Sequence, residues 1–229
     1  MSLPIAILAG GLATRMRPAT EKIPKALLDV NGRPFIDHQL RLLADHGLDQ
    51  VVLCTGFLGE QVENYVGDGS RFGLKVAYSS DWPELLGTGG ALKKALPLLG
   101  DVFMVLYGDS YLEIDYQAVA RAFAPQSHDA LMTVYENHDQ LDASNVLFKD
   151  GRLMVYSKKN KLPDMRHVDY GLQVLKSDVL KNEARDKFDL ADCLENLSAA
   201  KRLAGWLVDK RFYEIGSVAG LDDLRRHLS

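Results

Sequence analysis

Apolar runs of strand length alternate with amphipathic segments along the first 135 residues. Each run is nearly continuous in apolar side chains, which is typical of strands covered on both faces of a sheet. The runs are IAILA (5–9), QVVLCT (50–55), LKVAY (74–78), VFMVLY (102–107) and ALMTVY (130–135). Helical patterns lie between them, at 34–47, 59–66, 89–98 and 115–124. The alternation predicts βαβ units, with a parallel sheet between two layers of helices.

The pattern changes in the second part of the chain, where the expected strands are shorter. These strands are expected at 145–148, 151–156, 170–175, 204–208 and 211–215, and helices at 177–182, 189–200 and 217–228. No linker or repeat separates this part, so its strands are expected to join the same sheet. We therefore predict one α/β domain over 1–229, with a Rossmann-like, doubly wound, mixed but mostly parallel sheet in three α/β/α layers.

Charge and composition exclude several classes of function. The 229 residues carry a net charge of −4, which argues against a broad surface for nucleic acid or anionic membrane. Cys54 and Cys193 have no Cys or His partner at zinc spacing and are expected to be buried thiols. The first apolar run is too short for a signal peptide, and no stretch reaches the length of a membrane span. We expect a cytoplasmic protein, and Trp82 and Trp206 are expected in its core.

The first expected strand runs into a glycine loop that carries arginine. Gly10 and Gly11 stand where the strand ends, and Thr14 and Arg15 follow. Ligands of open α/β sheets bind outside the carboxyl ends of strands, and glycines allow backbone N–H groups to approach an anion. The Arg15 guanidinium suits phosphate oxygens, so the loop is predicted to bind phosphate. Neither common phosphate-loop pattern matches, and the loop alone leaves a plain glycine turn with exposed arginines open.

Four motifs together resemble one family closely. They are GGLATRMRP (10–18), PKALLDVNGRP (24–34), LGTGGAL (86–92) and YGDS (107–110). Their order and spacing are similar to those of the sugar-1-phosphate nucleotidyltransferases, over about the first half of the chain. The resemblance implies the nucleotide-diphospho-sugar transferase fold. It also implies a reaction that joins a nucleoside triphosphate to a sugar 1-phosphate and releases pyrophosphate.

The resemblance implies catalytic and metal-binding roles for four residues. Arg15 would hold the triphosphate and stabilise charge on the leaving pyrophosphate, and Lys25 would contact phosphate at the reacting centre. Asp109 follows an apolar strand and would bind Mg²⁺, which prefers oxygen ligands. Glu214, in FYEIGS, takes the place of the family's second metal-binding aspartate. The expected cofactor is therefore Mg²⁺, held by Asp109 and Glu214.

The same resemblance implies the nucleotide-binding residues. They are Ala9, Gly10, Gly11, Thr14, Arg15, Gly87, Thr88, Gly89 and Gly90. The last four are expected beside the nucleobase, because missing side chains leave room for a flat ring. Ala13 replaces a glycine of the family, which is tolerable if Ala13 has a negative φ. Residues 1–135 would form the nucleotide-binding half and 136–229 the half that binds the sugar phosphate.

Two segments of the second half resemble sugar-binding stretches of the family. In GRLMVYSKK (151–159), Lys159 falls on a lysine expected near the sugar phosphate, while Lys158 replaces a glutamate. Which of the two lysines contacts the phosphate stays open. Asp169 and Gly171 match a stretch that packs against the sugar: Asp169 would accept hydrogen bonds from hydroxyl groups, and Gly171 would permit close approach. A simple strand bend is the alternative.

Within the family, the chain is similar to two groups. The motifs resemble the D-glycero-α-D-manno-heptose 1-phosphate guanylyltransferases, which implies GTP and that heptose phosphate as substrates. They are also similar to short uridylyltransferases that act on N-acetylmuramate 1-phosphate. A sensor that has lost catalysis is an alternative from another class, against which the retained charged residues argue. A nicotinamide-dependent oxidoreductase is disfavoured, because the second strand ends in Cys54-Thr55-Gly56 without an acidic residue. Assembly into a homo-oligomer stays open.

Overall fold

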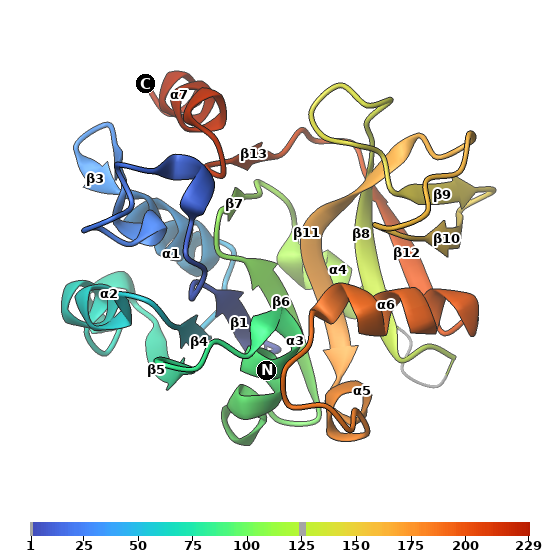
Figure 1. The fold of residues 1–229 in the computed structure, drawn as a ribbon, viewed down its shortest axis with the longest axis horizontal. Helices are drawn as coiled ribbons and strands as arrows, with labels where there is room; N and C mark the ends of the chain where they lie inside the picture. The colour runs from blue at the N-terminus through green and yellow to red at the C-terminus, as the bar shows by residue number, and fades with distance from the viewer. Residues whose placement is uncertain (1, 124–126) are drawn as a thin grey trace.

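A twisted sheet, to which the described residues contribute nine strands, runs through the molecule (Figure 1). The computed structural model describes residues 2–123 and 127–229. The strands of the sheet are β1 (Ile5–Leu8), β4 (Gln50–Thr55), β5 (Lys75–Ser80), β6 (Val102–Tyr107), β8 (Ala130–Glu136), β9 (Val146–Lys149), β10 (Arg152–Tyr156), β11 (His167–Lys176) and β12 (Leu203–Val208). Their order is β5-β4-β1-β6-β11-β8-β12, and the β9–β10 hairpin joins the sheet at β11. Strands of the second half therefore extend the sheet of the first half, as predicted.

Strand direction divides the sheet into a parallel and a mixed part. β5, β4, β1 and β6 are parallel, whereas β11 is antiparallel to both β6 and β8. From β1 the chain moves outward to β4 and β5, and it then returns to place β6 on the other side of β1. This reversal creates a topological switch point between β1 and β6. Ligands of doubly wound sheets bind at such a point, outside the carboxyl ends of the strands.

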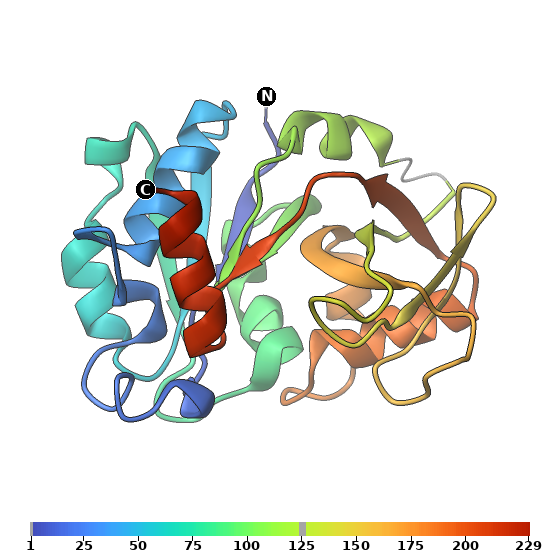
Figure 2. The ribbon, with the colours of Figure 1, turned by 90° about the horizontal axis from the view of Figure 1, so that it is seen from above.

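Helices cover both faces of the sheet, because successive side chains of each strand point to opposite faces (Figure 2). Ile5 and Ile7 pack into one buried cluster, and Ala6 packs into the other. The first cluster includes side chains of α1 (Phe35–Asp45), α2 (Gly59–Val66) and α4 (Tyr116–Ala122). The second includes side chains of α3 (Gly87–Ala95), α5 (Asp178–Lys181) and α6 (Leu190–Ala199). The predicted three-layer α/β/α fold is confirmed.

The C-terminal segment returns to the end of the central strand β6. There β13 (Tyr213–Glu214) pairs with β7 (Ser110–Tyr111), and Glu214 lies opposite Ser110. Helix α7 (Val218–His227) packs over this pair together with the short hairpin of β2 (Asp29–Val30) and β3 (Arg33–Pro34). Sequence analysis did not predict β7, β2 or β3, because strands of two residues carry no periodic signal.

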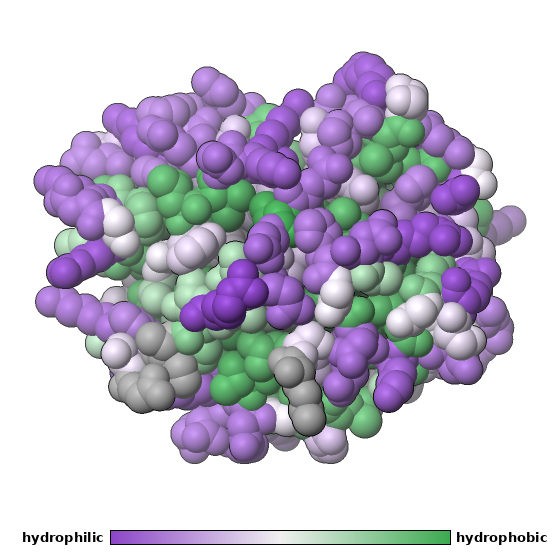
Figure 3. Space-filling model, turned by 180° about the vertical axis from the view of Figure 1, so that it is seen from behind, coloured by the Kyte–Doolittle hydropathy of each residue, from purple (hydrophilic) through white to green (hydrophobic). Residues whose placement is uncertain are grey.

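The surface corrects one expectation about the tryptophans. Trp82 is 52% exposed and Trp206 is 38% exposed, so neither is a core residue. Trp206 lies on the edge strand β12, and Trp82 follows the opposite edge strand β5. Cys54 and Cys193 are buried free thiols, as expected. From behind, polar side chains cover much of the surface, with apolar side chains visible between them (Figure 3).

Two further expectations concern helices. The helix expected at 115–124 is α4, and residue 124 lies outside the described residues. None of the helices within 2–123 and 127–229 is both long enough and apolar enough to cross a membrane.

Candidate active site

Three adjoining cavities form a cleft along the carboxyl ends of the sheet strands. We name them the β11 cavity, the central cavity and the glycine cavity, and their volumes are about 350, 270 and 210 Å³. The first two share Tyr107, Asp109 and Lys158, and the last two share Leu8, Gly11 and Thr88. The central cavity is lined by the ends of both β1 and β6, so the cleft crosses the topological switch point.

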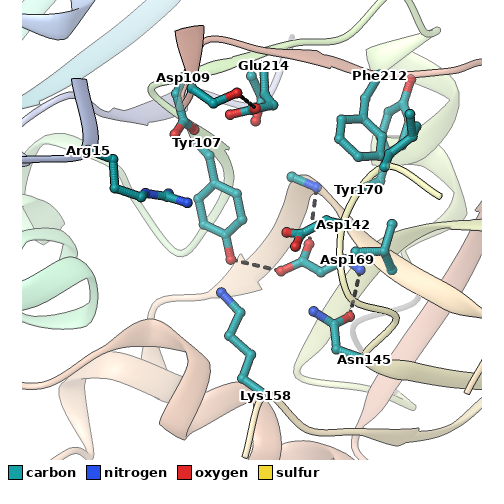
Figure 4. Close-up of a pocket in the computed structure, with 15 residues that line it drawn as sticks. Arg15, Tyr107, Asp109, Asp142, Asn145, Lys158, Asp169, Tyr170, Phe212 and Glu214 are labelled. Carbon is teal, nitrogen blue, oxygen red and sulfur yellow. Dashed lines mark hydrogen bonds between the residues drawn. The ribbon is translucent and has the colours of Figure 1, made fainter. Parts of the chain in front are cut away.

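Two carboxylates face each other where the cleft passes the end of β6 (Figure 4). Asp109 follows β6, and Glu214 reaches it because β13 pairs with β7; the Ile215 N–H donates to the Asp109 carbonyl at 3.0 Å. A Cβ atom placed on Gly216 would stand 2.3 Å from Glu214 Oε2 and 3.4 Å from Asp109 Oδ2. Both carboxylates thus border one small space, which any side chain at position 216 would fill.

Hydrogen bonds hold the Glu214 carboxylate in this position. The Gly216 N–H donates to Oε2, and the Ser217 hydroxyl donates to Oε1 at 3.2 Å. Ser217 is also the N-cap of α7, where its Oγ accepts from the Gly220 N–H at 3.0 Å. The start of α7 therefore fixes the orientation of the carboxylate.

Lys25 forms an ion pair with one of the two carboxylates. Its Nζ lies 2.7 Å from Asp109 Oδ2, and the two side chains are only 22% and 27% exposed. Lys25 opens a 3₁₀ turn, Lys25–Leu27, that directly follows Pro24. The turn places the ammonium group in the central cavity, beside the carboxylate pair.

Arg15 lies on a second 3₁₀ turn, Thr14–Met16, and lines the β11 cavity. Ala13, which precedes this turn, does not meet the condition of a negative φ: its φ is +47° and its ψ is 42°, a left-handed conformation. The turn requires this conformation because Ala13 caps it, and its carbonyl accepts from the Thr20 hydroxyl at 2.8 Å. A glycine would adopt this backbone with less strain.

The glycine-rich segments divide into residues that line the cleft and residues that pack elsewhere. Ala9, Gly10, Gly11, Gly87 and Thr88 line the central or the glycine cavity. Thr14, Gly89 and Gly90 do not belong to the lining of the three cavities.

Gly89 and Gly90 instead form a close contact between α3 and the segment before α6. Both N–H groups donate to the Phe188 carbonyl, at 3.0 and 3.2 Å. A Cβ on Gly89 would lie 2.2 Å from the Phe188 ring, and one on Gly90 would lie 2.2 Å from the Asp186 carbonyl oxygen. The absence of side chains therefore serves packing at these two positions.

A bulge in β11 presents Asp169 and Gly171 to the β11 cavity. The pairing of β11 with β8 shifts between Asp169 and Gln173, and Gly171 has a φ of +106°. Asp169 accepts hydrogen bonds from Tyr107 Oη at 2.8 Å, Gln173 Nε2 at 2.7 Å and the Gly171 N–H at 3.1 Å. Burial raises the pKa of the Asp169 carboxyl, although Lys158 and these donors oppose the shift.

Lys158 and Lys159 have opposite surroundings. Lys158 lines both the β11 and the central cavity, and its Nζ lies 5.5 Å from the centre of the Tyr107 ring (Figure 4). Lys159 is 69% exposed and pairs with Asp192 at 2.7 Å, outside the lining of the cleft. Of the two lysines, Lys158 and not Lys159 lines the cleft.

Sequence analysis missed several residues that line the cleft. Tyr107, Asn145 and Phe212 line the β11 cavity, and Asp81 lines the glycine cavity. Tyr107 and Asp81 stand at or directly after the ends of β6 and β5. The rule that ligands bind beyond strand ends could have indicated these two. Asn145 and Phe212 lie outside the strands and carry no such signal.

Comparison with known proteins identifies the family. A model of the family described as nucleotidyl transferase matches residues 5–225. The chain therefore belongs to the nucleotidyl transferase family, and the predicted similarity to sugar-1-phosphate nucleotidyltransferases is confirmed.

Individual relatives differ in the substrates that their names state. N-acetylmuramate alpha-1-phosphate uridylyltransferase from Neisseria meningitidis serogroup B is 40% identical over 134 residues, which are 57% of this chain and 58% of that protein. The match thus spans less than two thirds of that relative. D-glycero-alpha-D-manno-heptose 1-phosphate guanylyltransferase from Aneurinibacillus thermoaerophilus is 27% identical over 213 residues, covering 92% of this chain and 91% of the relative.

A solved structure supports the fold over the entire chain. The crystal structure of HddC from Yersinia pseudotuberculosis complexed with GMP-PN has a TM-score of 0.82 to this protein. The sequence identity is 23%, and the match covers 100% of both chains.

Proposed function

We propose that this protein transfers a nucleotidyl group from a nucleoside triphosphate to a sugar 1-phosphate. A phosphate oxygen of the sugar phosphate attacks the α-phosphorus and forms a new P–O bond. The bond from the α-phosphorus to the α,β-bridging oxygen breaks, and pyrophosphate leaves with that oxygen. The products are a nucleoside diphosphate sugar and pyrophosphate. The ionised phosphate is already a nucleophile, so the reaction requires no general base.

The observation that carries this proposal is the set of cations around the carboxylate pair. Arg15 and Lys158 line the β11 cavity together with Asp109 and Glu214 (Figure 4), and Lys25 lines the adjoining central cavity and pairs with Asp109. Two polyanions that react with each other must be aligned and their repulsion screened, and fixed cations do both. Arg15 would bind the leaving phosphates, Lys25 the reacting phosphate and Lys158 the phosphate of the sugar.

The carboxylate pair suits Mg²⁺. Asp109 and Glu214 offer oxygen ligands around the space beside Gly216, and Mg²⁺ in proteins is commonly held by one or two carboxylates plus substrate phosphates. No group of three or more His, Cys, Asp or Glu side chains suited to a metal occurs in 2–123 and 127–229, so phosphate oxygens would complete the coordination. When bound, the ion would neutralise phosphate charge.

Among the substrates, we favour GTP and D-glycero-α-D-manno-heptose 1-phosphate. The support is the guanylyltransferase from Aneurinibacillus, whose similarity extends over 92% of this chain. The second candidate is UTP with N-acetylmuramate 1-phosphate. It is supported by the higher identity, 40%, to the Neisseria uridylyltransferase over 134 residues.

A pyrophosphate-release screen tests both candidates. Purified protein with Mg²⁺ is mixed with GTP, UTP, CTP, ATP or dTTP and a panel of sugar 1-phosphates that includes both favoured sugars. We expect release with GTP and the heptose phosphate. Release with UTP and the muramate phosphate would keep the reaction and replace the substrates. A folded protein that binds nucleotide but releases no pyrophosphate with any pair would contradict the proposal and favour a sensor.

A further inference from the structure

The Glu214 carboxylate depends on a very short strand for its position. Glu214 lies on β13, a strand of two residues that pairs with the two residues of β7. A ladder of this length is at best marginally stable by itself. Lys210 and Arg211, which precede the strand, are exposed. Contacts between side chains are therefore needed to keep β13, and with it Glu214, beside Asp109.

Helix α7 lies beside β13 (Figure 1), and its first turn directly contacts Glu214. A Cβ atom placed on Gly220 would stand 2.4 Å from the Glu214 carbonyl oxygen and 2.6 Å from its Oε1. On another face of the helix, Leu221 and Leu224 are buried in an apolar cluster with Ile215. Any displacement of α7 relative to β13 would therefore change the surroundings of the Glu214 carboxylate.

The last turn of α7 is joined to the same strand pair by His227. Its ring stacks on the Tyr213 ring, with the ring centres 4.1 Å apart and an angle of 14° between the planes. Its Nε2–H donates to Glu113 Oε2 at 2.8 Å. Tyr213 directly precedes Glu214, and Glu113 follows β7 by two residues. A single imidazole ring thus contacts the chain on both sides of the β13–β7 pair.

A second contact lies one turn earlier on the same face of α7. Asp223 stands four residues before His227, and its carboxylate pairs with the Arg211 guanidinium. That guanidinium also lies 4.8 Å from the centre of the Tyr213 ring. We name these four residues the α7 clamp. The ion pair is partly exposed and contributes little by itself, so the stacked rings are the stronger part of the clamp.

We propose that His227 is a positioning residue for the carboxylate of Glu214. Through Tyr213, the α7 clamp holds β13 against β7, so that Glu214 and Asp109 border one space before a metal ion binds. Ligands held in place in advance bind a metal more tightly, because less ordering remains to be done on binding. His227 does not belong to the lining of the three cavities that the described residues form. The inference rests on the proposed function, and it assigns an effect on metal binding to a residue outside the cleft.

Amide hydrogen exchange, measured by NMR on the protein without ligands, tests the positioning directly. The Ile215 N–H donates to the Asp109 carbonyl, and the Gly216 N–H donates to the Glu214 carboxylate. In His227→Ala we expect both groups to exchange about 10-fold faster, because the stacked ring and one hydrogen bond are lost. Exchange in β1 and β6 should stay as in the wild type. His227→Phe keeps a flat ring against Tyr213 and should restore most of the protection.

Nucleotide binding at a series of Mg²⁺ concentrations tests the consequence without turnover. Calorimetry with GTP and, in parallel, with UTP gives the Mg²⁺ concentration at which the gain in affinity is half-maximal. We expect this concentration to rise about 10-fold in His227→Ala, as for residues that orient metal ligands. The affinity measured without Mg²⁺ should not change. Asp223→Asn should cause a smaller shift in the same direction, and it carries the test if His227→Ala fails to fold.

A double variant separates this role from a general effect on the structure. If His227 acts through Glu214, its loss has no further consequence once that carboxylate is gone. Glu214→Gln/His227→Ala should therefore need no more Mg²⁺ than Glu214→Gln alone. Additive shifts in the double variant would overturn the inference, and so would a loss of affinity of equal size with and without Mg²⁺.

His46→Ala is the matched control. His46 also lies beside an aromatic ring, that of Tyr116 at 5.5 Å, but it caps the end of α1 outside the cavity linings. It should change neither the exchange nor the Mg²⁺ dependence. Unchanged Mg²⁺ dependence in His227→Ala, beside a wild type that responds to Mg²⁺, would overturn the inference. A wild type that binds both nucleotides equally with and without Mg²⁺ would contradict the proposed metal site instead, and faster exchange in His227→Ala would still support the positioning of Glu214.

Discussion

The two ends of the cleft are built from different chemistry, although they adjoin. The β11 and central cavities are lined by three cations, Arg15, Lys25 and Lys158, together with Asp109 and Glu214. The glycine cavity, in contrast, is lined by small residues and carboxylates. The switch point between β1 and β6 separates these two ends of the cleft. The glycine loop that follows β1 lies on one side of it, and Asp109, which follows β6, lies on the other. Under the proposed function, the first end would hold the phosphates and the metal ion, and the second would hold the uncharged nucleobase.

The largest effect is expected from a change at the charged end. Asp109→Asn removes one member of the carboxylate pair and the ion pair with Lys25. We expect kcat for pyrophosphate release to fall about 1,000-fold, as when a preorganised charge is removed from a reaction centre. The change is isosteric and the side chain is partly exposed, so thermal unfolding should still show a folded protein.

Asp101→Asn is the control for this variant. Asp101 precedes the same strand, β6, at its opposite end, and its side chain is 99% exposed. It should retain wild-type turnover. Turnover of Asp109→Asn near the wild-type rate would contradict the assignment of the carboxylate pair to metal and phosphate.

A smaller loss is expected from Arg15→Ala. The guanidinium is proposed to bind the leaving phosphates, where charge accumulates as the bond breaks. We expect kcat to fall about 100-fold, while KM for the sugar 1-phosphate changes less than about threefold. Steady-state kinetics with both substrates varied gives the two parameters. Arg17→Ala is the control, since Arg17 is exposed and outside the cavity linings; equal losses in both variants would indicate a general charge effect.

Two neighbouring lysines, Lys158 and Lys159, differ in whether they line the cleft. Lys158→Ala removes a cation that lines two cavities, and we expect KM for the sugar 1-phosphate to rise about 10-fold, as for one lost charge-assisted hydrogen bond. Lys159→Ala breaks only an exposed pair with Asp192 and should change KM less than about twofold. The reverse ranking would show that Lys159 turns inward when substrate binds.

Asp169 should influence stability in a pH-dependent way. Burial raises the pKa of this carboxyl above its ordinary value of 3.8. The folded state therefore favours the protonated form of Asp169. The contribution of this carboxyl to the free energy of unfolding is full at low pH and is lost as pH rises through the folded-state pKa. Asp169→Asn removes this dependence. Relative to the wild type, the variant should become more stable as pH rises from 3.8 through the folded-state pKa of Asp169.

Thermal unfolding of both proteins across this range gives the measurement. Tyr107→Phe provides a companion test, because the Tyr107 hydroxyl donates to Asp169 and lowers the pKa of its carboxyl. Without that donor, the pH dependence should steepen. A constant difference between Asp169→Asn and the wild type at all pH values would contradict the raised pKa.

Most of the fold could be predicted from the sequence, because it depends on long apolar runs. The expected strands at 50–55 and 102–107 coincide with β4 and β6, and the helix expected at 59–66 is α2. The antiparallel direction of β11 could not be predicted, since strand direction follows from the path of the chain rather than from local periodicity. The pairing of β13 with β7 could not be predicted from the sequence either, because it joins two-residue strands that lie about 100 residues apart.

Resemblance to the family's motifs predicted four residues that the structure places in one cleft. Arg15, Lys25, Asp109 and Glu214 all reach one cleft, although their sequence separations are large. The choice between Lys158 and Lys159 could not be made from adjacent positions in a loop. Which lysine lines the cleft depends on contacts with α6. The Lys158 N–H donates to Glu195 Oε1 at 2.7 Å, and the Lys159 ammonium group donates to Asp192 outside the cleft.

The smallest effect concerns Ala13, whose conformation the sequence did not indicate. A left-handed backbone destabilises a non-glycine residue by about 1–2 kcal/mol. Glycine, in turn, loses about 0.5–1 kcal/mol more conformational entropy on folding than alanine does. Ala13→Gly should therefore stabilise the protein by about 0.5–1 kcal/mol, which corresponds to a rise in Tm of about 2 °C. Ala19→Gly, in the same loop and without a positive φ, should instead be destabilising. Equal destabilisation by both changes would mean that Ala13 adopts a negative φ in solution.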